Sequence, residues 1–496
     1  MFLFPLQIPM FPLLAFSPSS GFGDLAIFPL HVLQLILLKA GGRKVRILSR
    51  RFKRLFDDVN TALNIGQPLG TPYISDIGRC VSNVIRSSKA LESITVRGYR
   101  HQLSPLLCFA PALALPLGLR NLDLSYNRIG PDGVPSLASS LMALTMLHSL
   151  SLSENNMGPS GAASLAPSLL VLTRLRLLDL SSNNFGPAGA AALALPLMAL
   201  AGLETLNFRE NALEAAGAAA LAPSLMVLTG LHTLDLLDNA LGPDGAASLT
   251  PSLMAITGLQ NLNLGFNAFD AAGEELLAVV LMALTGLHTL EIVGNSLGPA
   301  GAISLASSLT ALTGLKLLDI SNNNLGPDGA ESLAPSLMAL TGLHTLDISR
   351  NYIIGSSGGA SLAPSLKLLT GLTSLDLSGN HIDMDGMVSL AASLTALTGL
   401  QNLIISSNIM GLAGASAFAP CLRLLTGLRT LELSCMSIGP VAATTLAPSL
   451  LALTGLQRLN LSGNSMGPAM AASLSSCFTA LTGLTKLNLA ANQLNP

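Results

Sequence analysis

Carboxylates recur at one position of a 28-residue pattern that runs through most of this 496-residue chain. In order along the chain, the position holds Asp123, Ser151, Asp179, Asn207, Asp235, Asn263, Glu291, Asp319, Asp347, Asp376, Ile404, Glu432, Asn460 and Asn488. If successive copies pair as strands, the four consecutive acids from Glu291 to Asp376 lie about 5 Å apart. Exposed carboxylates at that spacing repel by under about 1 kcal/mol per pair in water, and together they favour a basic partner.

Other residue types that do chemistry are too scattered to form a site. His148, His232, His288 and His344 occupy one repeat position, and three of them recur in every second copy. Strand spacing then separates these three by about 9–10 Å, too far for a shared metal ion. The sequence contains no GxxxxGK[ST], no HExxH and no metal-binding spacing of Cys and His. We therefore predict a protein that is not an enzyme and holds neither a metal nor a cofactor.

The repeated unit reads LxxLxLxxNxL, then G-P-x-G, then an Ala/Leu-rich segment and L-T-G-L. Its Asn recurs at Asn127, Asn155, Asn183, Asn211, Asn239, Asn267, Asn295, Asn323, Asn351, Asn380, Asn408, Asn464 and Asn492. Met436 replaces it once, and a degenerate copy begins at Leu91 with Tyr99 at the Asn position. The pattern predicts about 15 units over residues 91–496.

LHTLDLLDNAL and its copies resemble the leucine-rich repeat, and the unit length with GPDGAASLTPSL resembles the ribonuclease-inhibitor-like subclass. The resemblance implies an α/β solenoid, curved into a horseshoe with parallel strands on the concave face and helices on the convex face. The residue pattern agrees, because LxL alternation suits a short strand with Leu facing the core, and Asn suits a turn. The resemblance further implies a scaffold that binds a protein partner on its concave face.

Two details of the repeat lead to further predictions. Prolines fall within the Ala/Leu-rich segment at Pro167, Pro223, Pro251, Pro335, Pro364, Pro420 and Pro448. Because proline inside a helix costs on the order of 3 kcal/mol, we expect a short first turn followed by a second helical piece that starts at the proline. The second detail is on the strands, where two positions beyond the acidic one Ser is the rule.

Four consecutive units break the Ser rule with Arg209, Leu237, Gly265 and Val293. Glu210, Asp238 and Phe266 stand beside them. An Arg among exposed apolar residues is typical of an interface centre, so Arg209, Glu210, Leu237, Asp238, Phe266 and Val293 are candidate partner-binding residues together with the acidic row. Unselected drift among recent duplicates is the open alternative.

Residues 1–90 do not repeat, and we divide them into an apolar, poorly ordered segment at 1–24 and a helical head at 25–90. Residues 28–58 resemble an F-box: Pro29, Val32, Leu33, Ile36 and Leu37 match its first helix, and LSRRFKRL matches a later one. His31 and the short middle segment with Gly41 and Gly42 depart from the family pattern. The resemblance implies docking on the adaptor of an SCF-type ubiquitin ligase, with the repeats presenting a substrate.

Other interpretations of the head are open: a plain N-terminal cap of the solenoid, a nuclear-localisation run or a membrane-surface helix. Two rival functions come from other classes, a Ran GTPase-activating-protein-like regulator and an immune-type sensor scaffold without a nucleotide-binding domain. Against the first, the chain lacks that family's acidic tail and ends LNLAANQLNP.

Charge and cysteine usage bound the partners and the compartment. Residues 1–118 hold 13 Lys and Arg against 5 Asp and Glu, whereas the remainder holds 12 against 22. Scattered cysteines in an odd number favour a reducing compartment, so we predict a cytoplasmic or nuclear protein, with secretion as the less favoured alternative because residues 1–17 are apolar. The longest later apolar run has about 14 residues and contains Pro29, too short to span a bilayer, and we predict no nucleic-acid partner. The last strand carries no capping unit in this sequence, which predicts self-association at that edge or a longer natural chain.

Overall fold

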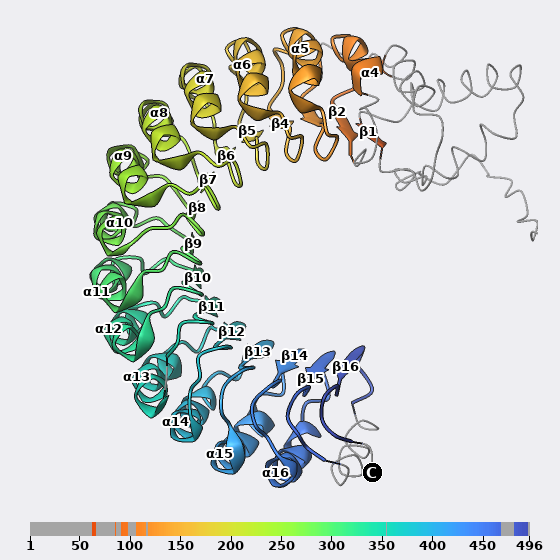
Figure 1. Ribbon diagram of the computed structural model, residues 1–496. Helices are drawn as coiled ribbons and strands as arrows, with labels where there is room; N and C mark the ends of the chain where they lie inside the picture. Colours follow the sequence, from red (N-terminus) through yellow and green to blue (C-terminus); the bar gives the residue numbers. More distant parts are fainter. Residues whose placement is uncertain are drawn as a thin grey trace, which may run out of the picture.

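The computed structural model describes residues 62–65, 85, 91–97, 106–115, 118–353, 355–467 and 481–494. They form an open horseshoe in which short strands line the inside of the curve and helices line the outside (Figure 1). The strands make a single parallel sheet of 16 strands, ordered β1 to β16 in chain order. This arrangement confirms the predicted leucine-rich-repeat solenoid.

Each strand from β3 onward has three residues, and β1 and β2 have four. The bounds are β1 Ala62–Ile65, β2 Ser93–Val96, β3 Asn121–Asp123, β4 Ser149–Ser151, β5 Leu177–Asp179, β6 Thr205–Asn207, β7 Thr233–Asp235, β8 Asn261–Asn263, β9 Thr289–Glu291, β10 Leu317–Asp319, β11 Thr345–Asp347, β12 Ser374–Asp376, β13 Asn402–Ile404, β14 Thr430–Glu432, β15 Arg458–Asn460 and β16 Lys486–Asn488. The sheet thus begins with β1, within the segment 25–90 that we expected to be helical. Leu63 of β1 pairs with Ile94 of β2, so β1 adds one strand before the first predicted unit.

The helices follow the strands one for one over most of the chain. Their bounds are α4 Leu106–Leu113, α5 Gly130–Leu141, α6 Gly158–Leu169, α7 Gly186–Met198, α8 Glu214–Val227, α9 Gly242–Ala255, α10 Ala271–Ala283, α11 Gly298–Leu309, α12 Gly326–Ala339, α13 Gly355–Leu368, α14 Met384–Leu394, α15 Gly411–Leu424 and α16 Pro440–Leu450. Many carry Pro at their first or second position, where a missing N–H costs nothing.

The predicted break at the internal prolines does not occur, because each helix continues through its proline. Pro223 lies inside α8 and Pro251 inside α9, and both side chains are exposed. Each proline therefore removes a hydrogen bond on the outer side of its helix. The carbonyl that loses its donor, four residues earlier, can bind water there, which lowers the cost of the lost bond.

A continuous apolar core fills the space between the sheet and the helices. From β4 to β14 the middle residue of the strand is buried while its two neighbours are half-buried, as at Leu234 between Thr233 and Asp235. In β16 all three residues are exposed. Leucines at the other consensus positions complete each layer, and the buried set runs without interruption from Ile85 to Leu481. Each unit thus buries its apolar face only by stacking on its neighbours.

The consensus Asn side chains are buried and join neighbouring units through hydrogen bonds. Asn211 is typical: its Nδ2 donates to the carbonyl oxygens of Leu180 at 3.0 Å and Phe208 at 2.9 Å. Its Oδ1 accepts from the backbone N–H groups of Asn183 at 3.1 Å and Phe185 at 3.4 Å. One amide therefore satisfies backbone groups of its own turn and of the turn before it.

Serine hydroxyls form a second link, between adjacent helices. In several units, a buried serine near the end of the helix donates its Oγ–H to a carbonyl in the preceding helix, whereas Ser168 and Ser308 donate to carbonyls of their own helices. Ser224 reaches Ala194 at 2.7 Å, and Ser252 reaches Ala222 at 2.8 Å. The same bond occurs at Ser140, Ser336 and Ser365. The helix layer is thus held in register by polar bonds as well as by apolar packing.

We predict that Asn211→Leu lowers the free energy of unfolding by about 2–4 kcal/mol, because it leaves buried N–H and carbonyl groups of two turns without partners. Urea unfolding followed by circular dichroism measures this change. Met436 supplies the control, since it occupies the same repeat position with no amide to lose and is buried as well. Met436→Leu should cost less than about 1.5 kcal/mol. Equal losses in the two variants would contradict the role assigned to the amide.

Candidate functional site

The acidic row, which we define as Glu291, Asp319, Asp347 and Asp376, lies on four neighbouring strands of the concave face. The strands pair in register, so that Glu291 stands opposite Asp319, Asp319 opposite Asp347, and Asp347 opposite Asp376. All four side chains are half-buried. Among the described residues, none of them forms an ion pair.

Hydrogen bonds within each strand fix where these carboxylates point. Asp319 Oδ1 accepts from the backbone N–H of Ser321 at 2.9 Å and from its hydroxyl at 2.6 Å. Asp347 and Asp376 accept in the same way from the backbone N–H groups of Ser349 and Ser378. The Ser rule of the sequence thus has a structural cause, because the serine is a hydrogen-bond donor to the acid two residues earlier. The other oxygen of each of these three aspartates is left for a partner. Glu291 differs, because its Oε2 accepts from Asn263 Nδ2 at 2.8 Å.

Burial and mutual repulsion make this row costly to ionise. Burial raises the pKa of Asp347 to about 6, and the neighbouring charges of Asp376 and Asp319 add to the rise, while hydrogen bonds from Ser349 oppose it. Burial likewise raises the pKa of Asp376, with Glu432 and Asp319 contributing. The pKa of Glu291 is raised by burial and then by Asp319 and Asp235, against an opposing effect of Arg209. A cation bound beside the row would lower these pKa values again, because a positive charge favours the ionised carboxylates.

The central patch, defined as Arg209, Glu210, Leu237, Asp238, Phe266 and Val293, adjoins the acidic row. Arg209 pairs with Glu210, with 2.8 Å between Nη2 and Oε1, and Glu210 also accepts from the Ser182 hydroxyl at 3.0 Å. Leu237 was expected to be exposed, but it is only 8% exposed and offers little surface. Phe266 is 46% exposed, Arg209 and Asp238 are exposed and Val293 is half-buried.

Two glycines explain part of the break in the Ser rule. A Cβ added at Gly265 would lie 2.6 Å from Cγ1 of Val293, and one added at Gly294 would lie 2.5 Å from the ring of Phe266. The Val293 side chain therefore packs against Gly265 of the preceding unit, and the Phe266 ring packs against Gly294 of the following unit. In the sequence, Val293 and Phe266 are each accompanied by a glycine in the neighbouring unit, and this pairing is a signal that we missed.

The same pairing of a large residue with a following glycine occurs elsewhere along this row of turns. The side chain of Arg350 lies against Gly379, and that of Cys435 lies against Gly463. The pairing is therefore a packing rule of this repeat position rather than a mark of one interface. In the central patch, the exposed Phe266 ring and the Arg209–Glu210 ion pair are the features that a partner would meet.

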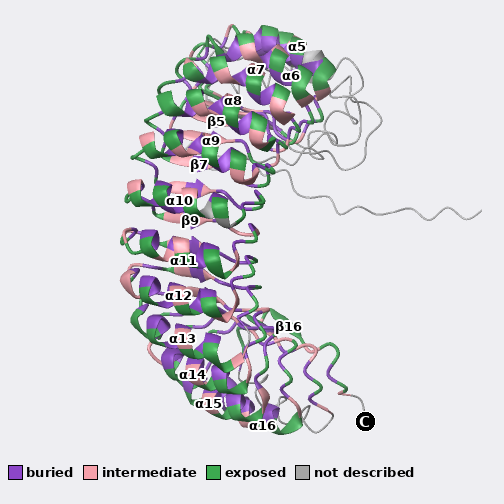
Figure 2. Cartoon of the chain, turned by 60° about the vertical axis from the view of Figure 1, so that its left-hand side comes forward, coloured by how far each residue is buried: buried purple, intermediate pink, exposed green. Residues whose placement is uncertain are grey.

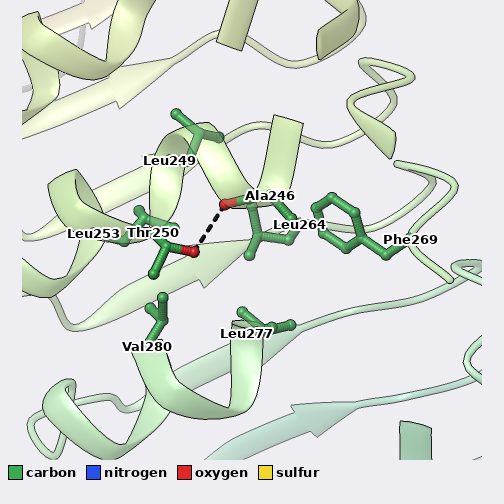
Figure 3. Close-up of a pocket in the computed structure, with 8 residues that line it drawn as sticks. All are labelled: Ala246, Leu249, Thr250, Leu253, Leu264, Phe269, Leu277 and Val280. Carbon is green, nitrogen blue, oxygen red and sulfur yellow. Dashed lines mark hydrogen bonds between the residues drawn. The ribbon is translucent and has the colours of Figure 1, made fainter. Parts of the chain in front are cut away.

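Two small apolar voids lie between neighbouring units of the described residues. One of them lies between α9 and α10, has a volume of about 10 Å³ and is lined by apolar side chains such as Leu253, Phe269 and Val280 (Figure 3). Thr250 stands beside it where most units have Ala, and its hydroxyl donates to the Ala246 carbonyl at 2.8 Å. That volume is about that of one water, too small for a ligand.

His232, His288 and His344 are exposed at the edge where the strands begin. Within the part of the chain that the structure describes, no group of three or more His, Cys, Asp or Glu has the arrangement of a metal site. In the same part, no helix has both the length and the apolar character needed to cross a membrane.

Comparison with known proteins supports the repeat assignment. Five segments, residues 119–138, 143–166, 172–194, 312–334 and 370–391, match the family model described as Leucine Rich repeat. With the one-strand, one-helix topology, these matches define a leucine-rich-repeat solenoid. The ribonuclease-inhibitor-like subclass stays a prediction.

Among solved structures, the chain is similar to an internalin from Listeria monocytogenes at 17% identity. The similarity covers 88% of this chain and 89% of the internalin, with a TM-score of 0.39. A search of the curated proteins found no match.

We predict that Asp347→Asn stabilises the protein above about pH 6 and has no effect below about pH 4. The pKa of Asp347 is raised to about 6 from an ordinary value of 3.8, so its contribution to stability is full below 3.8 and is lost as the pH rises through about 6. Asn carries no charge and keeps an oxygen for the Ser349 N–H. Urea unfolding at a series of pH values tests this, and a variant that is less stable at pH 7.5 would contradict it.

Proposed function

We propose that this protein is a non-enzymatic scaffold whose concave face binds a basic segment of a partner protein along the acidic row. The observation that carries the proposal is the in-register line of four half-buried carboxylates with no ion-pair partner among the described residues. The extended concave surface of a solenoid is the surface that such proteins commonly use for binding.

The electrostatics of the row favour a cationic ligand over a neutral one. Burial and mutual repulsion raise the pKa values of Glu291, Asp347 and Asp376, so ionising the row costs free energy in the unbound protein. Lys or Arg side chains above the row would remove much of that cost. Because part of each carboxylate is already desolvated, less water must be displaced when the partner arrives.

The size of the row defines the length of the bound segment. Three strand spacings of about 5 Å give about 15 Å, which an extended chain of four or five residues spans. The exposed Phe266 ring stands on the turn after β8, one strand before Glu291, and the Arg209–Glu210 pair follows β6. An apolar or acidic residue of the partner beyond the basic segment would meet this end of the site.

The test measures binding of an octa-arginine and an octa-glutamate peptide by fluorescence anisotropy at several salt concentrations. We expect octa-arginine to bind more tightly, with an affinity that falls as salt rises. Glu291→Gln with Asp319→Asn, Asp347→Asn and Asp376→Asn should weaken octa-arginine binding at least tenfold and flatten its salt dependence. These substitutions keep an oxygen for the Ser N–H groups, so folding is preserved.

A matched control removes four acids from the outer helices: Asp132→Asn, Glu275→Gln, Asp328→Asn and Glu331→Gln. All four side chains are exposed on helices α5, α10 and α12, and the change in net charge is the same. We expect octa-arginine binding to stay within about twofold of the unmodified protein. If both quadruple variants lose binding equally, net charge alone accounts for it and the acidic row is not the site.

Adaptor docking by the N-terminal head is a separate part of the proposed function. Pro29, Val32, Leu33, Ile36 and Leu37 lie outside the described residues, so the support for this part is the F-box resemblance of residues 28–58. If it holds, Leu33→Asp with Ile36→Asp should abolish capture of a purified SCF adaptor, because buried charges disrupt the docking helix. A pull-down measures this, and retained capture would refute the adaptor role without touching the acidic row.

A further inference from the structure

The outward side of helices α6 to α9 is apolar, in contrast to the ordinary polar exterior of a solenoid. We define this outer apolar face by Leu170, Leu195, Met198, Met226, Val227 and Met254, which are 40–66% exposed. Figure 2 shows these helices on the outside of the curve, with exposed positions along their outward surfaces. Within the four helices, Glu214 and Asp244 alone are charged, and both stand in the first turn.

The fold does not require an apolar residue at these positions. Met198, Met226 and Met254 occupy one repeat position, just where the helix ends. The apolar run at this position extends one helix to either side, to Met142 after α5 and Met282 in α10, and the residue after α16, Leu451, is also apolar. The same position holds Thr310 after α11, Lys367 in α13 and Arg423 in α15, and these side chains are exposed as well. Because polar and charged residues are accommodated there in the C-terminal half, repeat packing alone does not explain the run of Leu and Met in α6–α9.

The extent of this face is large for a monomer and suits a protein interface. Four helices of 12–14 residues, packed about 10 Å apart, cover about 35 Å by 20 Å, or roughly 700 Å². The largest apolar patch on a typical monomer is about 300–600 Å², whereas a stable interface buries about 800 Å² on each partner. The face thus approaches the area that one half of a stable dimer needs.

We propose that a second copy of this chain covers the outer apolar face, giving a dimer joined back to back through α6–α9. A twofold axis between α7 and α8 would place the Leu195 and Met198 region of one copy against the Met226 region of the other. Two identical faces can meet here because the four helices carry only Glu214 and Asp244 as charged residues, so that little charge would be buried between the copies.

Dimerisation by this route leaves both concave faces open. It is therefore independent of the proposed binding of a basic segment, and it would give the assembly two such sites facing in opposite directions. A partner with two basic segments would then bind more tightly through linkage of the two sites.

Sedimentation equilibrium of the full chain across the micromolar range tests the proposal, and we expect a monomer–dimer equilibrium. Met198→Lys with Met226→Lys should weaken self-association at least tenfold, because each lysine would have to lose its water in the interface. The substitutions copy Lys367 at the same repeat position, so the circular dichroism spectrum and the urea midpoint should stay near those of the unmodified protein.

The control adds two lysines at the same repeat position outside the face, as Thr310→Lys with Thr395→Lys. This variant should dimerise like the unmodified protein. The proposal is overturned if the unmodified chain is monomeric throughout, if the Met198 and Met226 variant associates as strongly as the unmodified chain, or if both lysine variants lose dimerisation equally.

Discussion

Every turn of this solenoid has to satisfy buried backbone groups, and one side-chain amide does so in most units. The Asn side chain donates to carbonyls of its own turn and of the preceding turn, and accepts from N–H groups of the preceding turn. At the start of the series, Asn127 donates to the carbonyl oxygens of Val96 and Leu124, while its Oδ1 has no partner among the described residues. The bonds therefore run in one direction, because the backbone N–H groups of each turn donate to the Asn Oδ1 of the following unit.

Because the Asn and the buried leucines hold the units together, the residues on the two outer surfaces are free to differ. On the concave face this freedom permits four carboxylates to stand in register, and burial raises the pKa values of Glu291, Asp347 and Asp376. On the convex face it permits Leu and Met at positions where other units have Thr, Lys or Arg. Both proposed interaction surfaces are thus departures from a repeat that would fold without them.

Much of the fold was predictable because the 28-residue pattern carries strong, repeated constraints. The strand position, the Asn turn and the concave location of the acidic row all follow from periodicity, and the structure confirms them. Strand β1 was not predictable, since its sequence ALNI lacks the repeat pattern and joins the sheet through pairing with β2. The continuous helices depend on solvent reaching the carbonyl released by each proline, which helix propensity alone does not describe.

The details of the candidate site were harder to predict because they depend on contacts between units. Burial of Leu237 and the packing of Phe266 over Gly294 involve three-dimensional neighbours that lie 28 residues away in sequence. The helix Ser–carbonyl bonds are a similar case, since a buried serine in an A-P-S-L segment gives no sign of its acceptor 30 residues earlier. These features become visible only when adjacent units are compared position by position.

The nearest-neighbour character of the Asn bonds bears on how such a chain can change over generations. Duplication or loss of one whole unit preserves every local bond, because each amide contacts only its own turn and the turn before it. A gain or loss of a partial unit would break the series at that point. The single 29-residue interval between Asn351 and Asn380 keeps the bond, with Asn351 N–H donating to Asn380 Oδ1 at 2.8 Å. Lineages carrying this gene can therefore lengthen or shorten the concave face by copy number, without redesigning the fold.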